Sequence, residues 1–108
     1  MKLQRILQTY RRLSEAKESL VHVHGRELLQ IPPNTAILLS IHDLIDKCQL
    51  QMEALEQLPI PSDEESVRTF CDALDDISTK SNEYFVTAAV FESDLHDRIC
   101  ASNRAIDR

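Results

Sequence analysis

The sequence predicts an all-α protein, folded as an antiparallel bundle of three long helices. Apolar residues recur every three or four positions over most of the chain, which places them on one face of a helix. The 108 residues include one glycine, so the tight turns of a β-rich fold are difficult to build. Prolines separate three periodic segments. We expect residues 1–108 to form a single domain.

The first predicted helix covers residues 2–24 and can extend to residue 30. Gly25 interrupts its apolar pattern, and a glycine inside a helix costs about 1 kcal/mol relative to alanine. We therefore expect the helix to end at Gly25 or to continue weakly to Gln30. Pro32 and Pro33 end it in either case, because proline lacks an amide hydrogen.

The second predicted helix covers residues 35–58. Asn34 is a favourable N-cap, because its side chain can accept a hydrogen bond from a free amide of the first turn. Pro59 and Pro61 then break the helical pattern. The apolar stripe between these signals consists of Ile37, Leu38, Ile41, Leu44, Ile45, Cys48, Met52, Leu55 and Leu58.

The third predicted helix covers residues 63–104. Ser62 and Glu65 have the spacing of a capping box at its start. The apolar pattern keeps one phase through the polar stretch 78–82, although Ser81 occupies a position where an apolar residue is expected. A helix break usually shifts the phase, so we favour one helix of roughly 60 Å. The alternative is a break near 78–82, which gives four helices.

Charge and composition restrict the classes of function. The net charge is −6, with +3 in residues 1–30 and −6 in residues 63–108, and this acidity disfavours a nucleic-acid binder. No apolar run is long enough to span a membrane, and no signal-peptide core follows the N-terminus. We expect a cytoplasmic protein whose three cysteines, Cys48, Cys71 and Cys100, are reduced core residues.

The candidate chemical residues form no strong signature. His22 and His24 point in different directions on a helix, whereas Glu92, His96 and Cys100 share one helix face. Two histidines alone make no zinc site. The spacing of Glu92, His96 and Cys100 can hold a metal or place a thiolate beside an imidazole, but this face flanks the core register and is expected to be solvated. We predict no catalytic residue, metal or cofactor. The alternative is a metal-binding or histidine phosphotransfer-like bundle. His24 is followed by a glycine, as in such domains, but no lysine lies in the following turn and the basic neighbour is Arg26.

We therefore predict a non-enzymatic protein-interaction module: a subunit, adaptor or chaperone that acts as a homodimer or in a hetero-complex. The segment from Tyr84 to Phe91 is apolar on more than one side of its helix. Such a segment either forms the core of a compact bundle or leaves an apolar seam for a partner. The predicted partner contacts are Tyr84, Phe85, Val90, Phe91 and Leu95, with Leu28, Leu29 and Ile31 as a second set.

Overall fold

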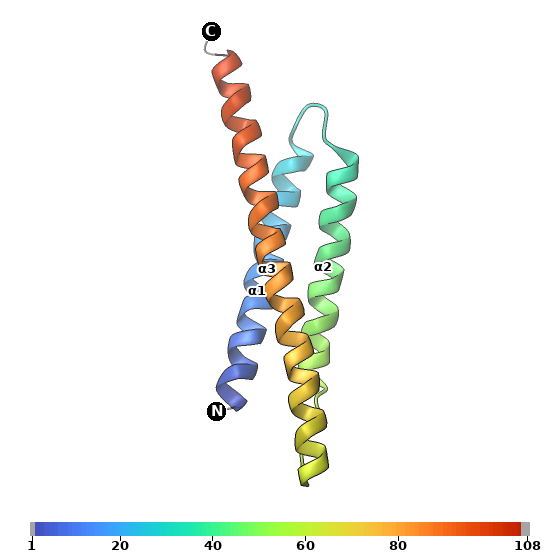
Figure 1. The fold of residues 1–108 in the computed structure, drawn as a ribbon. Coiled ribbons are helices and arrows are strands. Elements are labelled where there is room, and N and C mark those ends of the chain that lie inside the picture. The colour runs from blue at the N-terminus through green and yellow to red at the C-terminus, as the bar shows by residue number, and fades with distance from the viewer. Residues whose placement is uncertain (1, 107–108) are drawn as a thin grey trace.

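The computed structural model describes residues 2–106 and consists of three helices over that range, without a strand. They are α1 (Lys2–Leu28), α2 (Thr35–Glu56) and α3 (Glu64–Ile106). The chain runs up, down and up, so α2 is antiparallel to both of the others while α1 and α3 are parallel (Figure 1). The bundle is a rod that measures 67 × 22 × 14 Å. The predicted all-α bundle of three helices is confirmed.

The helix boundaries follow local signals closely. α1 continues through Gly25 and ends at Leu28, so the interruption at the glycine does not break it. Asn34 caps α2 as predicted, because its Oδ1 accepts a hydrogen bond from the Ile37 amide at 3.2 Å. α2 ends at Glu56, two residues before the predicted end.

α3 is a single helix of 43 residues. The prediction of one continuous helix is therefore confirmed, and the alternative of a break near 78–82 is wrong. Its cap differs from the prediction. Asp63, rather than Ser62, accepts a hydrogen bond from the Ser66 amide at 2.7 Å. A carboxylate also benefits from the positive end of the helix, which favours Asp63 in this position. The hydrogen bonds with Ser66 lower the pKa of Asp63.

The core is built on a strict alternation of three-residue and four-residue steps in both α1 and α3. This repeat of 3.5 residues is typical of helices that pack side by side along their whole length. In α1 the buried residues are Thr9, Leu13, Ala16, Leu20, Val23 and Glu27. In α3 they are Phe70, Leu74, Ile77, Ser81, Ala88 and Leu95, with the half-buried Tyr84, Phe91 and Arg98 in the remaining positions of the repeat. From α2, the core receives Ile41, Leu44, Cys48, Met52 and Leu55.

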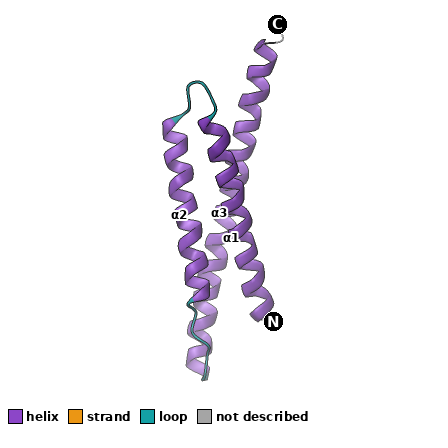
Figure 2. Cartoon of the chain, turned by 180° about the vertical axis from the view of Figure 1, so that it is seen from behind, coloured by secondary structure: helices purple, strands orange, loops and turns teal. Residues whose placement is uncertain are grey.

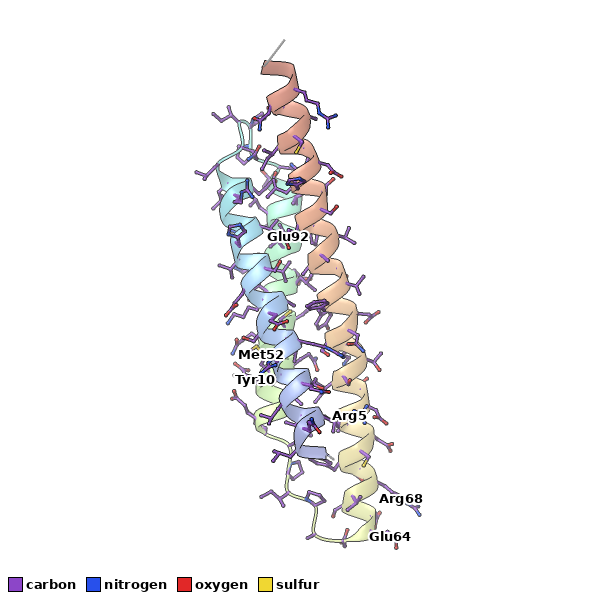
Figure 3. All side chains as sticks on the ribbon, turned by 90° about the vertical axis from the view of Figure 1, so that its left-hand side faces the viewer. Arg5, Tyr10, Met52, Glu64, Arg68 and Glu92 are labelled. Atoms are coloured by element: carbon purple, nitrogen blue, oxygen red, sulfur yellow. The ribbon has the colours of Figure 1, made fainter. Side chains whose placement is uncertain are left out.

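Polar pairs set the register between the parallel helices α1 and α3. Each pair joins residues that are 70 to 73 positions apart. They are Arg5 with Asp75, Arg12 with Asn82 at 2.6 Å, Ser19 with Glu92 at 3.0 Å, and Glu27 with Arg98 at 2.8 Å. In this register α3 begins below the start of α1 and its last turns project beyond the α1–α2 connection (Figure 2). Arg5 and Glu92, from the first and third of these pairs, are labelled in Figure 3.

Two buried hydroxyl groups interrupt the apolar core. Ser81 is fully buried, and its Oγ donates to the carbonyl oxygen of Ser78 at 2.8 Å. Thr9 is 2% exposed, and its Oγ1 donates to the carbonyl oxygen of Arg5 at 2.9 Å. Each hydroxyl is thus satisfied within its own helix, which is why a serine can replace the expected apolar residue at position 81 without an unpaired buried group.

Candidate functional site

The structure divides the predicted seam on α3 between the core and the surface. Tyr84 and Phe91 are half-buried and pack against the core, and Leu95 is only 2% exposed. Phe85 and Val90 are 43% and 62% exposed. Leu95 therefore belongs to the bundle's own core, which removes it from the surface that a partner can reach.

The exposed part of the seam is a compact apolar patch. Phe85, Val86, Ala89 and Val90 are all exposed, and their spacing of one, four and five residues places them on one outward face of α3. We call these four residues the α3 patch. The predicted set of contacts omitted Val86 and Ala89. The signal that identifies them is the four-residue step from Phe85 to Ala89 and from Val86 to Val90.

Acidic side chains border the α3 patch. Glu83 precedes Val90 by seven residues and Asp97 follows it by seven, so all three lie along the same line of the helix surface. Glu83 and Asp97 are exposed. A third carboxylate, Glu92, flanks the patch on the side of α1, where its Oε2 accepts a hydrogen bond from Ser19 Oγ at 3.0 Å. Carboxylates therefore border the patch, while the guanidinium of Arg12, which donates to Asn82 Oδ1 at 2.6 Å, lies near its edge on the side of α1.

The second predicted set lies at the connection between α1 and α2. Leu28, Leu29 and Ile31 are 54%, 78% and 99% exposed. This connection is level with the Glu27–Arg98 pair, whereas the α3 patch is level with the middle of α1. The two predicted sets are therefore separate surfaces.

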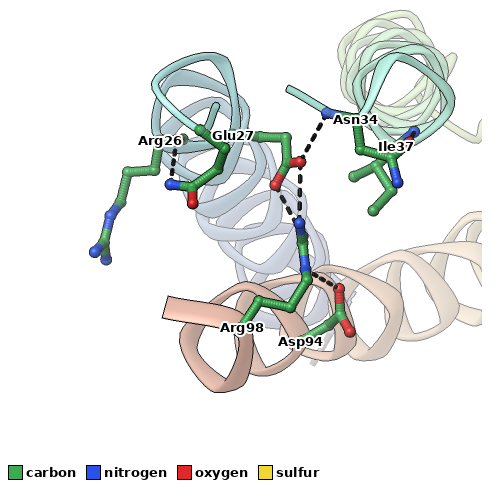
Figure 4. Close-up of polar contacts among 7 residues, drawn as sticks. Arg26, Glu27, Asn34, Ile37, Asp94 and Arg98 are labelled. Atoms are coloured by element: carbon green, nitrogen blue, oxygen red, sulfur yellow. Dashed lines mark hydrogen bonds and ion pairs between the residues drawn. The ribbon is translucent and has the colours of Figure 1, made fainter. Parts of the chain in front are cut away.

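An ion pair that the sequence analysis did not identify closes the bundle beside this connection. Glu27 is fully buried, and its carboxylate accepts hydrogen bonds from Arg98 Nη1 at 3.0 Å and Nη2 at 2.8 Å (Figure 4). Its Oε1 also accepts from the Asn34 amide at 3.1 Å, and Asp94 accepts from Arg98 Nε at 3.0 Å. One carboxylate thus joins α1, the α1–α2 connection and α3. We call Glu27 and Arg98 the clasp.

The clasp makes stability depend on pH in the acidic range. The hydrogen bonds from Arg98, assisted by the Asn34 amide, lower the pKa of Glu27 from its ordinary value of 4.5, although burial opposes this shift. A lowered pKa in the folded state contributes stability above the unfolded value, and this contribution is lost as the pH falls through the folded value. We expect urea unfolding to show a decline in stability below pH 4.5 that is shallower in Glu27→Gln. Equal slopes would contradict the assignment.

Two histidines line a groove of about 330 Å³ between α1 and α3. His22, Glu92 and His96 line it, and Cys100 Sγ lies 3.6 Å from His96 Nε2. Within residues 2–106, no group of three or more histidine, cysteine or acidic side chains is arranged to hold a metal ion. His24, considered for phosphotransfer, is half-buried on α1.

The three cysteines are free thiols in different surroundings. Cys48 is fully buried, and burial raises its pKa to about 11. Its thiol is therefore protonated at neutral pH and fills space in the core, as the sequence predicted. Cys71 and Cys100 are half-buried on α3 and lie outside the core, so the prediction of three core cysteines is wrong for these two.

A further hollow of about 330 Å³ lies where α2 connects to α3. Leu58, Ile60, Phe70 and Ala73 supply apolar lining, and Asp63 and Glu65 contribute carboxylates. α1 begins level with the second to third turn of α3, so the connection alone covers this end of the bundle (Figure 1).

None of the helices, over the part of the chain that the structure describes, is sufficiently long and apolar to cross a membrane. Comparison of the chain with protein families, with curated proteins and with solved structures finds no match in any of the three.

Proposed function

We propose that this protein is a helical protein-interaction module, a subunit, adaptor or chaperone within a larger assembly, that binds a helix of another protein through the α3 patch. The observation that carries the proposal is the position of Phe85, Val86, Ala89 and Val90 on the outward face of α3. None of the four belongs to the core of the bundle, which other residues complete.

A helix is the occupant that best fits this surface. The patch is narrow and straight because it follows one face of a single helix. An amphipathic helix with apolar residues three and four positions apart can lie along it and bury both apolar faces. Burial of apolar surface contributes about 25 cal/mol per Å², so covering the four side chains favours the contact. The partner then acts as a fourth helix beside the bundle.

The acidic border specifies the charge of the partner. Glu83 and Asp97 lie on the same line of α3 as Val90, one on each side. Lysine or arginine residues that flank the apolar face of a partner helix would pair with them, and the pairing would favour a basic partner over an acidic one. We expect the affinity to fall as salt is added, because exposed charges are screened.

The test compares two variants of matched exposure. Val86 on α3 and Leu50 on α2 are each 61% exposed. The purified protein, Val86→Asp and Leu50→Asp are immobilised and used to capture proteins from native lysate, which are quantified by mass spectrometry. We expect at least one protein to be captured equally by the parent chain and by Leu50→Asp. The amount of this protein captured by Val86→Asp should be lower by about tenfold or more.

Circular dichroism of the same variants checks that the bundle stays folded, since both substitutions are on the surface and expected to change stability little. A captured protein that both aspartate variants lose equally would reflect general adhesion to apolar surface. If capture of every protein is independent of position 86, the proposed function is contradicted.

A further inference from the structure

A second exposed apolar line follows the length of α1. Leu7, Ser14, Val21 and Leu28 recur every seven residues and so lie along one face of the helix. The three apolar members are 61%, 53% and 54% exposed. We call these four residues the α1 stripe. A hollow of about 310 Å³ adjoins its centre, lined by Ser14, Val21 and Met52 of α2 among others.

Gly25 lies beside the α1 stripe, and nothing within the described part of the bundle explains why this residue is a glycine. It is the chain's single glycine and lies inside a helix, where alanine is more favourable. It is exposed, and a Cβ atom at this position would meet nothing within 4 Å. Within the described part of the chain, therefore, no neighbouring atom would clash with a side chain at position 25 and so require a glycine there. What a glycine on a helix surface does allow is the close approach of another molecule.

The sequence of this face is complementary to itself. The midpoint between Leu7 and Leu28 falls between Lys17 and Glu18, and so does the midpoint between Ser14 and Val21. When two copies of α1 are placed antiparallel about that point, Leu7 of one copy faces Leu28 of the other. In the same way, Lys17 of each copy faces Glu18 of the other. The same operation places Tyr10 opposite Gly25. The Tyr10 ring is half-buried against the core of its own bundle, and its hydroxyl donates to Glu56 Oε1 at 3.3 Å, so its exposed edge is what a second copy meets.

We propose that the α1 stripe is a self-association surface on which α1 of a second copy packs antiparallel, with a twofold axis between Lys17 and Glu18. An isologous contact of this kind uses the same residues on both copies and closes as a dimer. The proposal does not depend on the α3 patch, which lies on another helix. Both surfaces can be occupied at once.

The charges favour a second copy in this orientation. Glu18 is exposed and, within the region described by the structure, makes no ion pair, while Lys17 Nζ donates to the neutral Gln49 Oε1 at 2.7 Å. The antiparallel arrangement gives two reciprocal Lys17–Glu18 pairs. A parallel arrangement would place like charges against each other at both positions. The acidic border of the α3 patch makes that face a poor surface for self-association for the same reason.

Sedimentation velocity from micromolar to millimolar concentration tests the dimer. We expect the parent chain to dimerise and Val21→Asp to weaken dimerisation by about tenfold or more. Gly25→Ala is the sharper variant. It should raise the thermal midpoint of the dilute monomer, because alanine favours the helix, and still weaken the dimer by about tenfold. If it stabilises the monomer and leaves the dimer unchanged, the proposed contact at Gly25 is wrong.

Charge exchange tests the twofold arrangement. Lys17→Glu and Glu18→Lys should each weaken the homodimer, and an equimolar mixture of the two variants should form a heterodimer, because opposite charges face each other again. Leu50→Asp is the matched control, since Leu50 and Leu7 are both 61% exposed. A chain that stays monomeric at every concentration overturns the proposal, as does a dimer that Val86→Asp dissociates and Val21→Asp does not.

Discussion

Replacing Glu27 by alanine is expected to lower the free energy of unfolding by about 2–4 kcal/mol. The substitution leaves the guanidinium of Arg98 without its buried partner and the Asn34 amide without its acceptor. Loss of one member of a buried ion pair is costly because the remaining charge is poorly hydrated. Arg98 is 36% exposed, so water reduces the penalty below that of a fully buried charge. Urea unfolding at neutral pH measures the change.

The double variant Glu27→Leu with Arg98→Leu is expected to recover most of this loss. Both positions belong to the 3.5-residue repeat that forms the core, so two leucines can pack against each other there. Replacing a buried ion pair by apolar residues is often neutral or stabilising. Asp43→Ala, which removes the exposed pair with Lys47, is the control and should cost less than about 1 kcal/mol. A double variant no more stable than Glu27→Ala would contradict this view of the clasp.

Replacing Leu20 by alanine is expected to lower the free energy of unfolding by about 3–5 kcal/mol. Leu20 is fully buried on the core face of α1, and truncating it removes apolar contacts and leaves a cavity that neighbouring helices fill only in part. Leu50→Ala is the matched control on α2, since Leu50 is 61% exposed. Alanine and leucine have similar helix propensities, so this control should change stability by less than about 0.5 kcal/mol. Similar losses for the two variants would contradict the assigned core.

The candidate surfaces were predictable in part. The run from Tyr84 to Phe91 was visible in the sequence because it is apolar on several sides of one helix. Periodicity alone does not tell which side faces the neighbouring helices. The register with α1 decides this, and it places Leu95 inside while Val86 and Val90 remain outside.

The sequence by itself determined the helical fold, the separation of the helices by prolines and the Asn34 cap, and it favoured the continuity of α3. These features depend on local chemistry and on a phase that is preserved along one segment. Only the tertiary structure decided that Glu27 is a core residue. A charged side chain beside an apolar stripe is usually solvated, and Glu27 is buried because Arg98, 71 positions away, reaches it across the parallel helices.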